Sequence, residues 1–398
     1  MIQIKLDKDI KKQIKGLHWL WFWKRLNDKE LHLTTGTVSA YQFLNQHLGW
    51  TKKDLYKIAL GEYSDLLEYV KPTNTYNRSY ATFYNLLPLT LDFFMWNIGR
   101  KNYGPKTIAR KRKDVLFDCF GYDDFRCGSY TFKNVWVPER VKNWCAFSLV
   151  EKIKIEVCPY CNKEYIPIIK TNNTFRAEID HFFPEAEYPF LSCSLFNFIP
   201  SCLVCNHHKN DTYNKYDNQG NIQLTIYPYT EGFEEIDGNG QKKKNAVFKA
   251  IPGSGDLYKS KAIELEYKNP SLDDKMKNSN GAFLIQELYN TCTTELENLL
   301  TRYRNYAEPK INDIVKNLSV GSELATELES LSISDSEKNN LLNKILLLFN
   351  KSMRNQILGI PLNSSGQKVD KEYPFRKFKN DIIEQLDEWV EKKKSGKI

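Results

Sequence analysis

The sequence predicts an α+β protein in which mainly helical N- and C-terminal regions flank a central segment that contains strands. Residues 1–70 have a helical pattern, and apolar residues recur at helical spacing again from residue 283. Between these parts, residues 176–182 alternate as a strand does, and two Cys-x-x-Cys pairs are separated by forty residues. We therefore expect a basic helical region at 1–116, a central domain at 117–235 and a helical region at 236–398.

The composition is that of an ordinary soluble protein. Charged residues make up 27% of the 398 residues, and hydrophobic residues make up 41%. No run approaches the eighteen apolar residues of a membrane-spanning helix, and the N-terminus lacks the apolar core of a secretory signal. We expect a cytoplasmic protein with no membrane partner.

The positive charge is concentrated in the N-terminal part. Residues 1–150 contain 24 Lys and Arg against 14 Asp and Glu, whereas the remaining residues contain 33 against 35. Such an excess is typical of a region that binds a polyanion. The sharpest basic run is Arg110, Lys111, Arg112 and Lys113, which predicts phosphate contacts; a solvated helix face is the alternative.

Two short helices are predicted at 37–48 and 51–60, joined at Gly49. Thr51 followed by Asp54 is typical of a capping box. Such a pair can be a DNA-reading helix-turn-helix, although a helical hairpin is the commoner arrangement. The aromatic cluster at 19–23 is interpreted as core rather than as a platform on which bases stack.

The two Cys-x-x-Cys pairs predict a zinc site. Structural zinc takes four ligands in a tetrahedron, and each pair presents two thiolates from one tight turn. One pair alone would fit redox chemistry equally well, and thiol–disulfide exchange stays open as an alternative. The predicted ligands are Cys158, Cys161, Cys202 and Cys205.

Polar residues of a second kind lie between the two cysteine pairs. Asp180 and His181 end the predicted strand at 176–182, and Asn197 opens a second predicted strand at 198–201. Adjacent strand residues point to opposite faces, so both side chains meet one phosphate only at a strand end or bulge. A neutral imidazole can take a proton near pH 7, while a carboxylate binds hard cations. Asn206 then begins a predicted helix that continues to Lys209.

Residues 158–211 resemble the HNH, or ββα-metal, nucleases. The shared pattern is CxxC, then Asp-His-x-x-Pro, then Asn five residues before a second CxxC that is followed by Asn-x-x-Lys. A looser similarity, from about residue 117 to 233, is to HNH proteins of bacterial anti-phage systems of Septu and retron-linked types. The resemblance implies a zinc-stapled ββα-metal nuclease core.

The resemblance also implies a role for each matched residue. His181 would be the general base and Asn197 would orient it, Asp180 and Asn206 would bind catalytic Mg²⁺ or Mn²⁺, and Lys209 would contact nucleic acid. The implied activity is metal-dependent endonuclease cleavage, one strand per site, of DNA in preference to RNA. A regulatory protein partner, for example an ATPase, is a further expectation.

The chain departs from the family pattern in two places. Asn206 stands where many members have His, so His207 or His208 is an alternative ligand. Residues 185–190 replace the glycine-rich loop that is common after the Asp-His motif. A zinc-stabilised nucleic-acid-binding or scaffold module without catalysis is the alternative function.

The C-terminal region is expected to be helical and to carry no chemistry. Helices are predicted at 283–318, 341–358 and 378–393, and Ser334 with Glu337 forms a capping-box pattern before the second of them. We interpret this region as a packing or partner-docking part of the chain.

Overall fold

The computed structural model describes residues 1–33, 36–86, 115–170, 175–209, 211–236, 241–305, 334, 336–337, 340–341, 352–362 and 373–397. The chain divides into two compact units, one formed by Met1–Asn245 with Tyr267–Leu284 and the other by Ala246–Glu266 with Ile285–Ile398. Helices and small two-stranded sheets are mixed along the chain, so the predicted α+β class is confirmed. The basic run Arg110–Lys113 lies outside the described residues.

The first unit combines helices with three two-stranded sheets among its described residues. Its helices are α1 (Lys8–Asp28), α2 (Ala40–Leu48), α3 (Lys52–Leu60), α4 (Tyr63–Tyr69), α5 (Thr75–Leu86), α7 (Tyr122–Cys127), α8 (Glu139–Lys142), α9 (Ala146–Ile153), α10 (Leu203–Lys209) and α11 (Asp273–Phe283). Its strands are β1 (Glu30–Leu33), β2 (Gly36–Ser39), β3 (Glu178–His181), β4 (Phe198–Ser201), β5 (Glu234–Ile236) and β6 (Lys242–Lys244). Its short 3₁₀ helices are η1 (Pro189–Leu191), η2 (Leu195–Asn197) and η4 (Pro270–Leu272).

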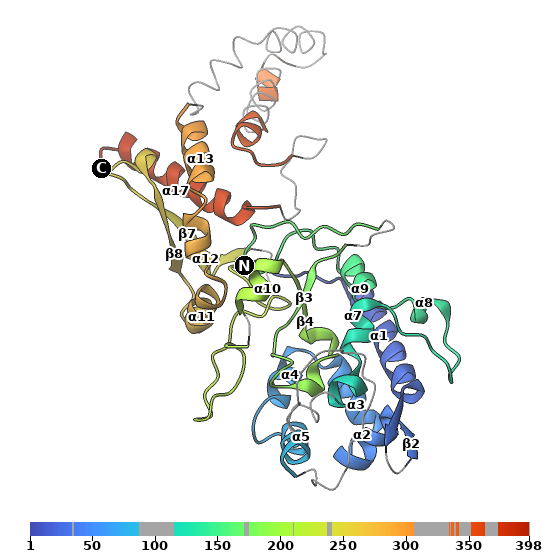
Figure 1. Cartoon of the computed structure of the whole chain (residues 1–398). Helices are drawn as coiled ribbons and strands as arrows, with labels where there is room; N and C mark the ends of the chain where they lie inside the picture. The colour runs from blue at the N-terminus through green and yellow to red at the C-terminus, as the bar shows by residue number, and fades with distance from the viewer. Residues whose placement is uncertain are drawn as a thin grey trace. The chain divides into compact units, whose positions relative to one another are not determined.

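Helix α1 is the centre of the N-terminal part, and α2, α3, α8 and α9 pack against it (Figure 1). Asp7 caps its first turn by accepting a hydrogen bond from the backbone N–H of Ile10 at 2.8 Å. Trp21 and Phe22 are buried, in agreement with the core interpretation of residues 19–23. Trp19 and Trp23 are only partly buried and stack on each other, with centroids 5.6 Å apart.

Helices α2 and α3 form where capping residues predict them. Thr51 and Asp54 make the reciprocal capping box at the start of α3, and Ser39 with Gln42 makes another before α2. Gly49 ends α2 with a φ of 70°, a left-handed conformation that glycine adopts at low cost. Residues 37–39 belong to β2, so the helix that was expected from residue 37 begins at Ala40.

Two buried charges attach the segment after residue 115 to α1. Arg25 is 1% exposed; it pairs with Asp124 and donates to the backbone carbonyls of residues 118–119. Asp28 accepts hydrogen bonds from the consecutive backbone N–H groups of residues 133–135. Because buried charges are stable only when they are paired and hydrogen-bonded, these two residues fix the path of the chain toward α9.

Strands β3 and β4 pair antiparallel, from Glu178 opposite Ser201 to His181 opposite Phe198. Helix α10 follows directly and packs on β3 and on α11 (Figure 1). The strand, strand and helix predicted for this segment are therefore present in that order. Residues before α1 also join this part, because the N–H of Ile2 donates to the Pro159 carbonyl at 2.8 Å.

The second unit consists of a two-stranded sheet covered by helices. Its described residues include β7 (Ala246–Ile251), η3 (Leu257–Lys259), β8 (Ala262–Tyr267), α12 (Ile285–Asn290), α13 (Thr293–Asn305), a helical stretch at 352–357 and α17 (Arg376–Lys394). Helix α17, predicted at 378–393, packs on β7. Its Asp381 carboxylate accepts a hydrogen bond from the backbone N–H of Phe248 at 3.0 Å. The predicted helix at 283–318 is present as α12 and α13 as far as residue 305, and most of 341–358 lies outside the described residues. Among the helices described, none has the length and apolarity that a membrane crossing needs.

Candidate metal centre

Four cysteine sulfurs meet where the two Cys-x-x-Cys turns face each other. The sulfurs of Cys158, Cys161, Cys202 and Cys205 all lie within 4.8 Å of one another, and all four residues are buried. A tetrahedral zinc with Zn–S bonds of about 2.3 Å would place its sulfurs about 3.8 Å apart, so the cluster is of the right size. These four residues could hold a zinc ion, as the sequence predicted.

Each turn is shaped by backbone donors that point at sulfur. The N–H of Lys163 donates to Cys161 Sγ, and the N–H of Cys205 donates to Cys202 Sγ, both at 3.4 Å. Hydrogen bonds from the neighbouring thiols lower the pKa of Cys161 below its usual range, whereas burial raises the pKa of Cys158. A bound zinc would replace the thiol protons.

Both cysteine turns carry a side chain that reaches Asp180 on β3. Tyr160, inside the first turn, donates its hydroxyl to Asp180 Oδ2 at 2.6 Å, and its ring stacks on Phe283 with centroids 4.1 Å apart. Lys209, at the end of the helix that begins in the second turn, donates to both oxygens of Asp180 at 3.0 and 2.8 Å. The two turns thus converge on one carboxylate.

Asp180 and Lys209 form a buried ion pair, with side chains 7% and 1% exposed. Lys209 also donates to the backbone carbonyl of His181, so its ammonium faces the site rather than solvent. A carboxylate offers about four lone pairs, and the donors from Tyr160 and Lys209 occupy three of them. One lone pair of Oδ1 is left to meet a further cation or donor.

The ring of His181 is held in one tautomer. Its Nε2 lies 2.9 Å from the backbone carbonyl of Ser192, and a carbonyl only accepts, so Nε2 carries the proton. Tyr122 and Phe198 pack edge-on against the ring, with centroids 4.4 and 5.4 Å away. In the neutral ring Nδ1 is therefore the basic nitrogen.

Glu185 faces that basic nitrogen. Its Oε2 lies 3.6 Å from His181 Nδ1, and this buried oxygen finds no hydrogen-bond donor among the described residues. Two acceptors at this separation need a proton, a water molecule or a cation between them. The sequence prediction did not include Glu185, and its position four residues after His181 was the available signal.

Asn197 shapes the loop that carries Ser192. Its amide accepts from the N–H of Phe183 at 2.8 Å and donates to the carbonyls of Phe183 and Leu191 at 3.0 and 3.1 Å. Asn197 is fully buried, and all the polar atoms of its side chain are engaged. Its contact with Leu191 lies one residue before Ser192, whose carbonyl faces the His181 ring.

The other predicted residues of α10 lie at different depths. Asn206 is half-buried and precedes Lys209 by three residues, so it lies on the same face of the helix. His207 and His208 are exposed, and a ring nitrogen of His208 lies 3.1 Å from the carbonyl of Ala282.

The Asp180 carboxylate and the His181 ring have different side-chain partners among the described residues. The β3–β4 register is regular through His181, and the N–H of Phe182 continues it by donating to the Asn197 carbonyl. The two side chains therefore leave opposite faces of the strand, and of the two expected arrangements, a strand end or a bulge, the structure shows the strand end, because β3 ends at His181.

Comparison of the chain with protein-family models, with curated proteins and with solved structures finds no match.

Proposed function

We propose that this protein is a metal-dependent endonuclease of the HNH type, with a zinc-stapled ββα-metal core that hydrolyses phosphodiester bonds of DNA one strand at a time. The observation that carries the proposal is the fixed tautomer of His181. A carbonyl holds Nε2–H at 2.9 Å, which leaves Nδ1 free to accept a proton, and an acidic residue stands beside it.

The water that attacks phosphorus would be held between Nδ1 of His181 and Oε2 of Glu185. Nδ1 would take its proton as the oxygen attacks, and the Ser192 carbonyl would stabilise the resulting imidazolium through Nε2–H. Asn197 would keep that carbonyl in place through its bonds to the loop. This assigns general-base catalysis to His181 and a water-orienting role to Glu185.

The residues on β3 and α10 also fit a hard cation. Asp180 retains one lone pair on Oδ1, and the half-buried Asn206 offers an amide oxygen, so these two residues would hold Mg²⁺ or Mn²⁺. When bound, the cation would neutralise charge on the phosphate and assist the leaving oxygen. Zinc would remain with the four thiolates because they are softer ligands.

A second candidate function is a zinc-stabilised nucleic-acid-binding or scaffold module without catalysis. The buried Asp180–Lys209 pair favours it, because Lys209 already neutralises the carboxylate that a catalytic metal would need. The intact combination of His181, Glu185 and Asn197 favours the nuclease, since zinc-dependent folding requires none of these residues.

Incubation of purified protein with supercoiled plasmid separates the two candidates. The nuclease predicts nicked product with Mg²⁺ or Mn²⁺, and none after EDTA. Parallel reactions with single-stranded DNA and RNA identify the substrate. Intact substrates in every reaction would fit either the binding module or a nuclease that cleaves only with its regulatory partner. We further propose a cytoplasmic role in anti-phage defence with a regulatory partner such as an ATPase; free cleavage by the isolated protein would argue against that control.

A further inference from the structure

A row of lysines lies along one face of α1. Lys8, Lys11, Lys12 and Lys15 follow the spacing i, i+3, i+4 and i+7, which places them on one side of the helix. All four line a hollow of about 510 Å³ together with Trp19 and Tyr56. At 1.5 Å per residue the row extends for about 10 Å along the helix. We call these lysines and the two aromatic residues the lysine–aromatic face.

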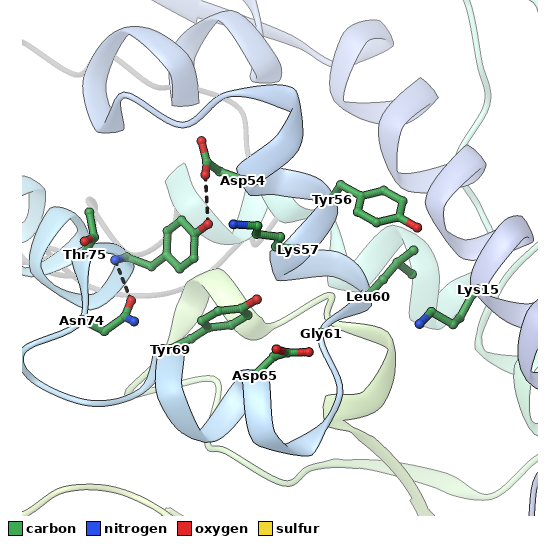
Figure 2. Close-up of a pocket in the computed structure, with 11 residues that line it drawn as sticks. Lys15, Asp54, Tyr56, Lys57, Leu60, Gly61, Asp65, Tyr69, Asn74 and Thr75 are labelled. Atoms are coloured by element: carbon green, nitrogen blue, oxygen red, sulfur yellow. Dashed lines mark hydrogen bonds between the residues drawn. The ribbon is translucent and has the colours of Figure 1, made fainter.

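A second hollow adjoins the first and has a different lining. It measures about 580 Å³ and is lined by Tyr56, Tyr69 and Tyr76 and by Lys57 of α3. Figure 2 shows this hollow, which is lined by residues of α3, α4 and α5 and by Lys15 of α1. The two hollows share Lys15, Tyr56 and Leu60. Each has the volume of an ordinary small-molecule site.

The charges of the two hollows differ. The first is lined by four lysines and by Glu62, which binds Lys11 and Lys15 at 2.8 and 3.2 Å. Lys8 and Lys12 are exposed, and neither has an ion pair within the part of the chain that the structure describes. The first hollow is therefore positive.

The second hollow is close to neutral, because Lys15 and Lys57 are matched by Asp54 and Asp65. Both carboxylates are already engaged. Asp54 accepts the Tyr76 hydroxyl at 2.9 Å, and Asp65 accepts the backbone N–H of Glu62 at 3.0 Å. What remains open to a ligand is aromatic surface, with Tyr56 46% exposed.

We propose that the lysine–aromatic face binds single-stranded nucleic acid, with phosphates over the lysines of α1 and an unstacked base against Tyr56. Single strands are bound by this combination of a positive groove and aromatic side chains, since every base has a face that can stack. In a duplex the base faces are stacked on one another and cannot contact tyrosine. An acidic peptide has no bases to place in the tyrosine-lined hollow.

The face is joined directly to the loop of the candidate nuclease site. The ammonium groups of Lys11 and Lys15 lie 5.4 and 5.7 Å from the ring centre of Phe196, the neighbour of Asn197. The hydroxyl of Ser194 donates to the Ile58 carbonyl on α3 at 2.6 Å. The inference goes beyond the proposed function, because these residues would bind a strand whether or not the protein cleaves it.

The test is a fluorescence-anisotropy titration of a labelled oligothymidine of about 20 nucleotides, carried out in EDTA so that no metal-dependent cleavage occurs. The double variant Lys8→Glu with Lys12→Glu should raise Kd at least tenfold. It should also reduce the slope of log Kd against log salt by about 1.4, since each phosphate contact of a single strand contributes about 0.7. The matched control, Lys392→Glu with Lys397→Glu, changes the net charge equally on exposed lysines of the C-terminal part and should leave Kd within threefold.

Tyr56→Ala should raise Kd about tenfold without changing the salt slope, and Tyr56→Phe should restore binding, because stacking needs only the ring. Tyr165→Ala removes a tyrosine that is 62% exposed elsewhere and is the matched control. Circular dichroism of each variant checks its fold. Equal losses in variants and controls, equal affinity for duplex, or full competition by polyglutamate would overturn the inference. Plasmid cleavage is scored separately, so its absence leaves this result unaffected.

Discussion

The hydroxyl of Tyr160 donates to the carboxylate of Asp180 at 2.6 Å, and this contact joins the cysteine cluster to the candidate catalytic strand. Tyr160 is the third residue of a Cys-Pro-Tyr-Cys turn, so its position depends on the two cysteines that flank it. Lys209 makes the equivalent connection from the second cysteine turn through α10. Zinc binding would therefore hold Tyr160 and Lys209, the two partners of Asp180, in place. Loss of zinc would loosen both contacts.

Loss of one cysteine ligand should remove zinc and unfold the site. We expect wild type to contain about one zinc per chain by mass spectrometry, and Cys158→Ser or Cys202→Ser to contain much less and to melt at a lower temperature. Zinc binding to such a cluster can contribute on the order of 10 kcal/mol, which a small segment cannot replace. Cys127→Ser, at an exposed cysteine, is the control. Full zinc content in Cys158→Ser would refute the assignment of the ligands.

Tyr160→Phe should separate the zinc site from Asp180. The ring would keep its stacking on Phe283, so zinc content should stay at the wild-type value. Loss of a hydrogen bond to a buried carboxylate should lower the free energy of unfolding by about 1.5–3 kcal/mol. Urea denaturation measures this, with Tyr165→Phe at an exposed position as the control. An unchanged free energy of unfolding would show that the contact contributes nothing.

The Asp180–Lys209 pair should show strong coupling. Lys209→Met leaves the buried carboxylate without its ammonium, which should cost about 3–5 kcal/mol. The double variant with Asp180→Asn should be more stable than the sum of the two single effects predicts, by about 1–3 kcal/mol in a double-mutant cycle. Additive effects would mean that the two side chains do not interact in solution.

His18 should make the protein less stable at acid pH. Burial lowers the pKa of His18 to about 4, and its ring lies between the Cys193 carbonyl and the indole N–H of Trp144. Between pH 6.5 and 4 the unfolded chain binds a proton that the folded chain excludes, so stability falls as pH is lowered through this window. The contribution of this one residue should reach about 3 kcal/mol at pH 4.

The measurement is the free energy of unfolding of wild type and His18→Gln at several pH values. Gln can still donate to the Cys193 carbonyl but does not titrate. The difference between the two curves should change steeply from pH 6.5 to 4 and stay flat above pH 7.5. Parallel curves would contradict a neutral, buried His18.

The sequence was most informative where a feature depends on neighbours along the chain. Capping of α3 by Thr51 and Asp54 follows from local spacing, as does each Cys-x-x-Cys turn, and the prediction that the two turns meet rested on the four ligands that zinc needs. The partners of Lys209 were not, because they depend on how α10 packs on β3. The proposed nucleic-acid contact of Lys209 would require its buried ammonium to leave Asp180.

Residues that look alike in the sequence also differ in burial in the structure. Within the aromatic cluster of α1, Trp21 is buried, whereas Trp19 lies at the rim of a hollow. The spacing of Glu185 four residues after His181 was a weak signal in the sequence, and its importance emerges from a side-chain oxygen that lies 3.6 Å from the His181 ring and has no hydrogen-bond donor among the described residues. A sequence pattern shows which kinds of side chain are present, and the tertiary contacts decide which of these side chains can face a ligand.

The most direct test of the nuclease proposal compares plasmid nicking by wild type, His181→Ala and His207→Ala in Mg²⁺ or Mn²⁺. His207 is an exposed histidine on α10 and serves as the matched control. Because a general base contributes about 100-fold to 10,000-fold in rate, His181→Ala should lose at least 99% of the nicking rate while His207→Ala retains it. Equal nicking by all three proteins would contradict the role of His181 as the base.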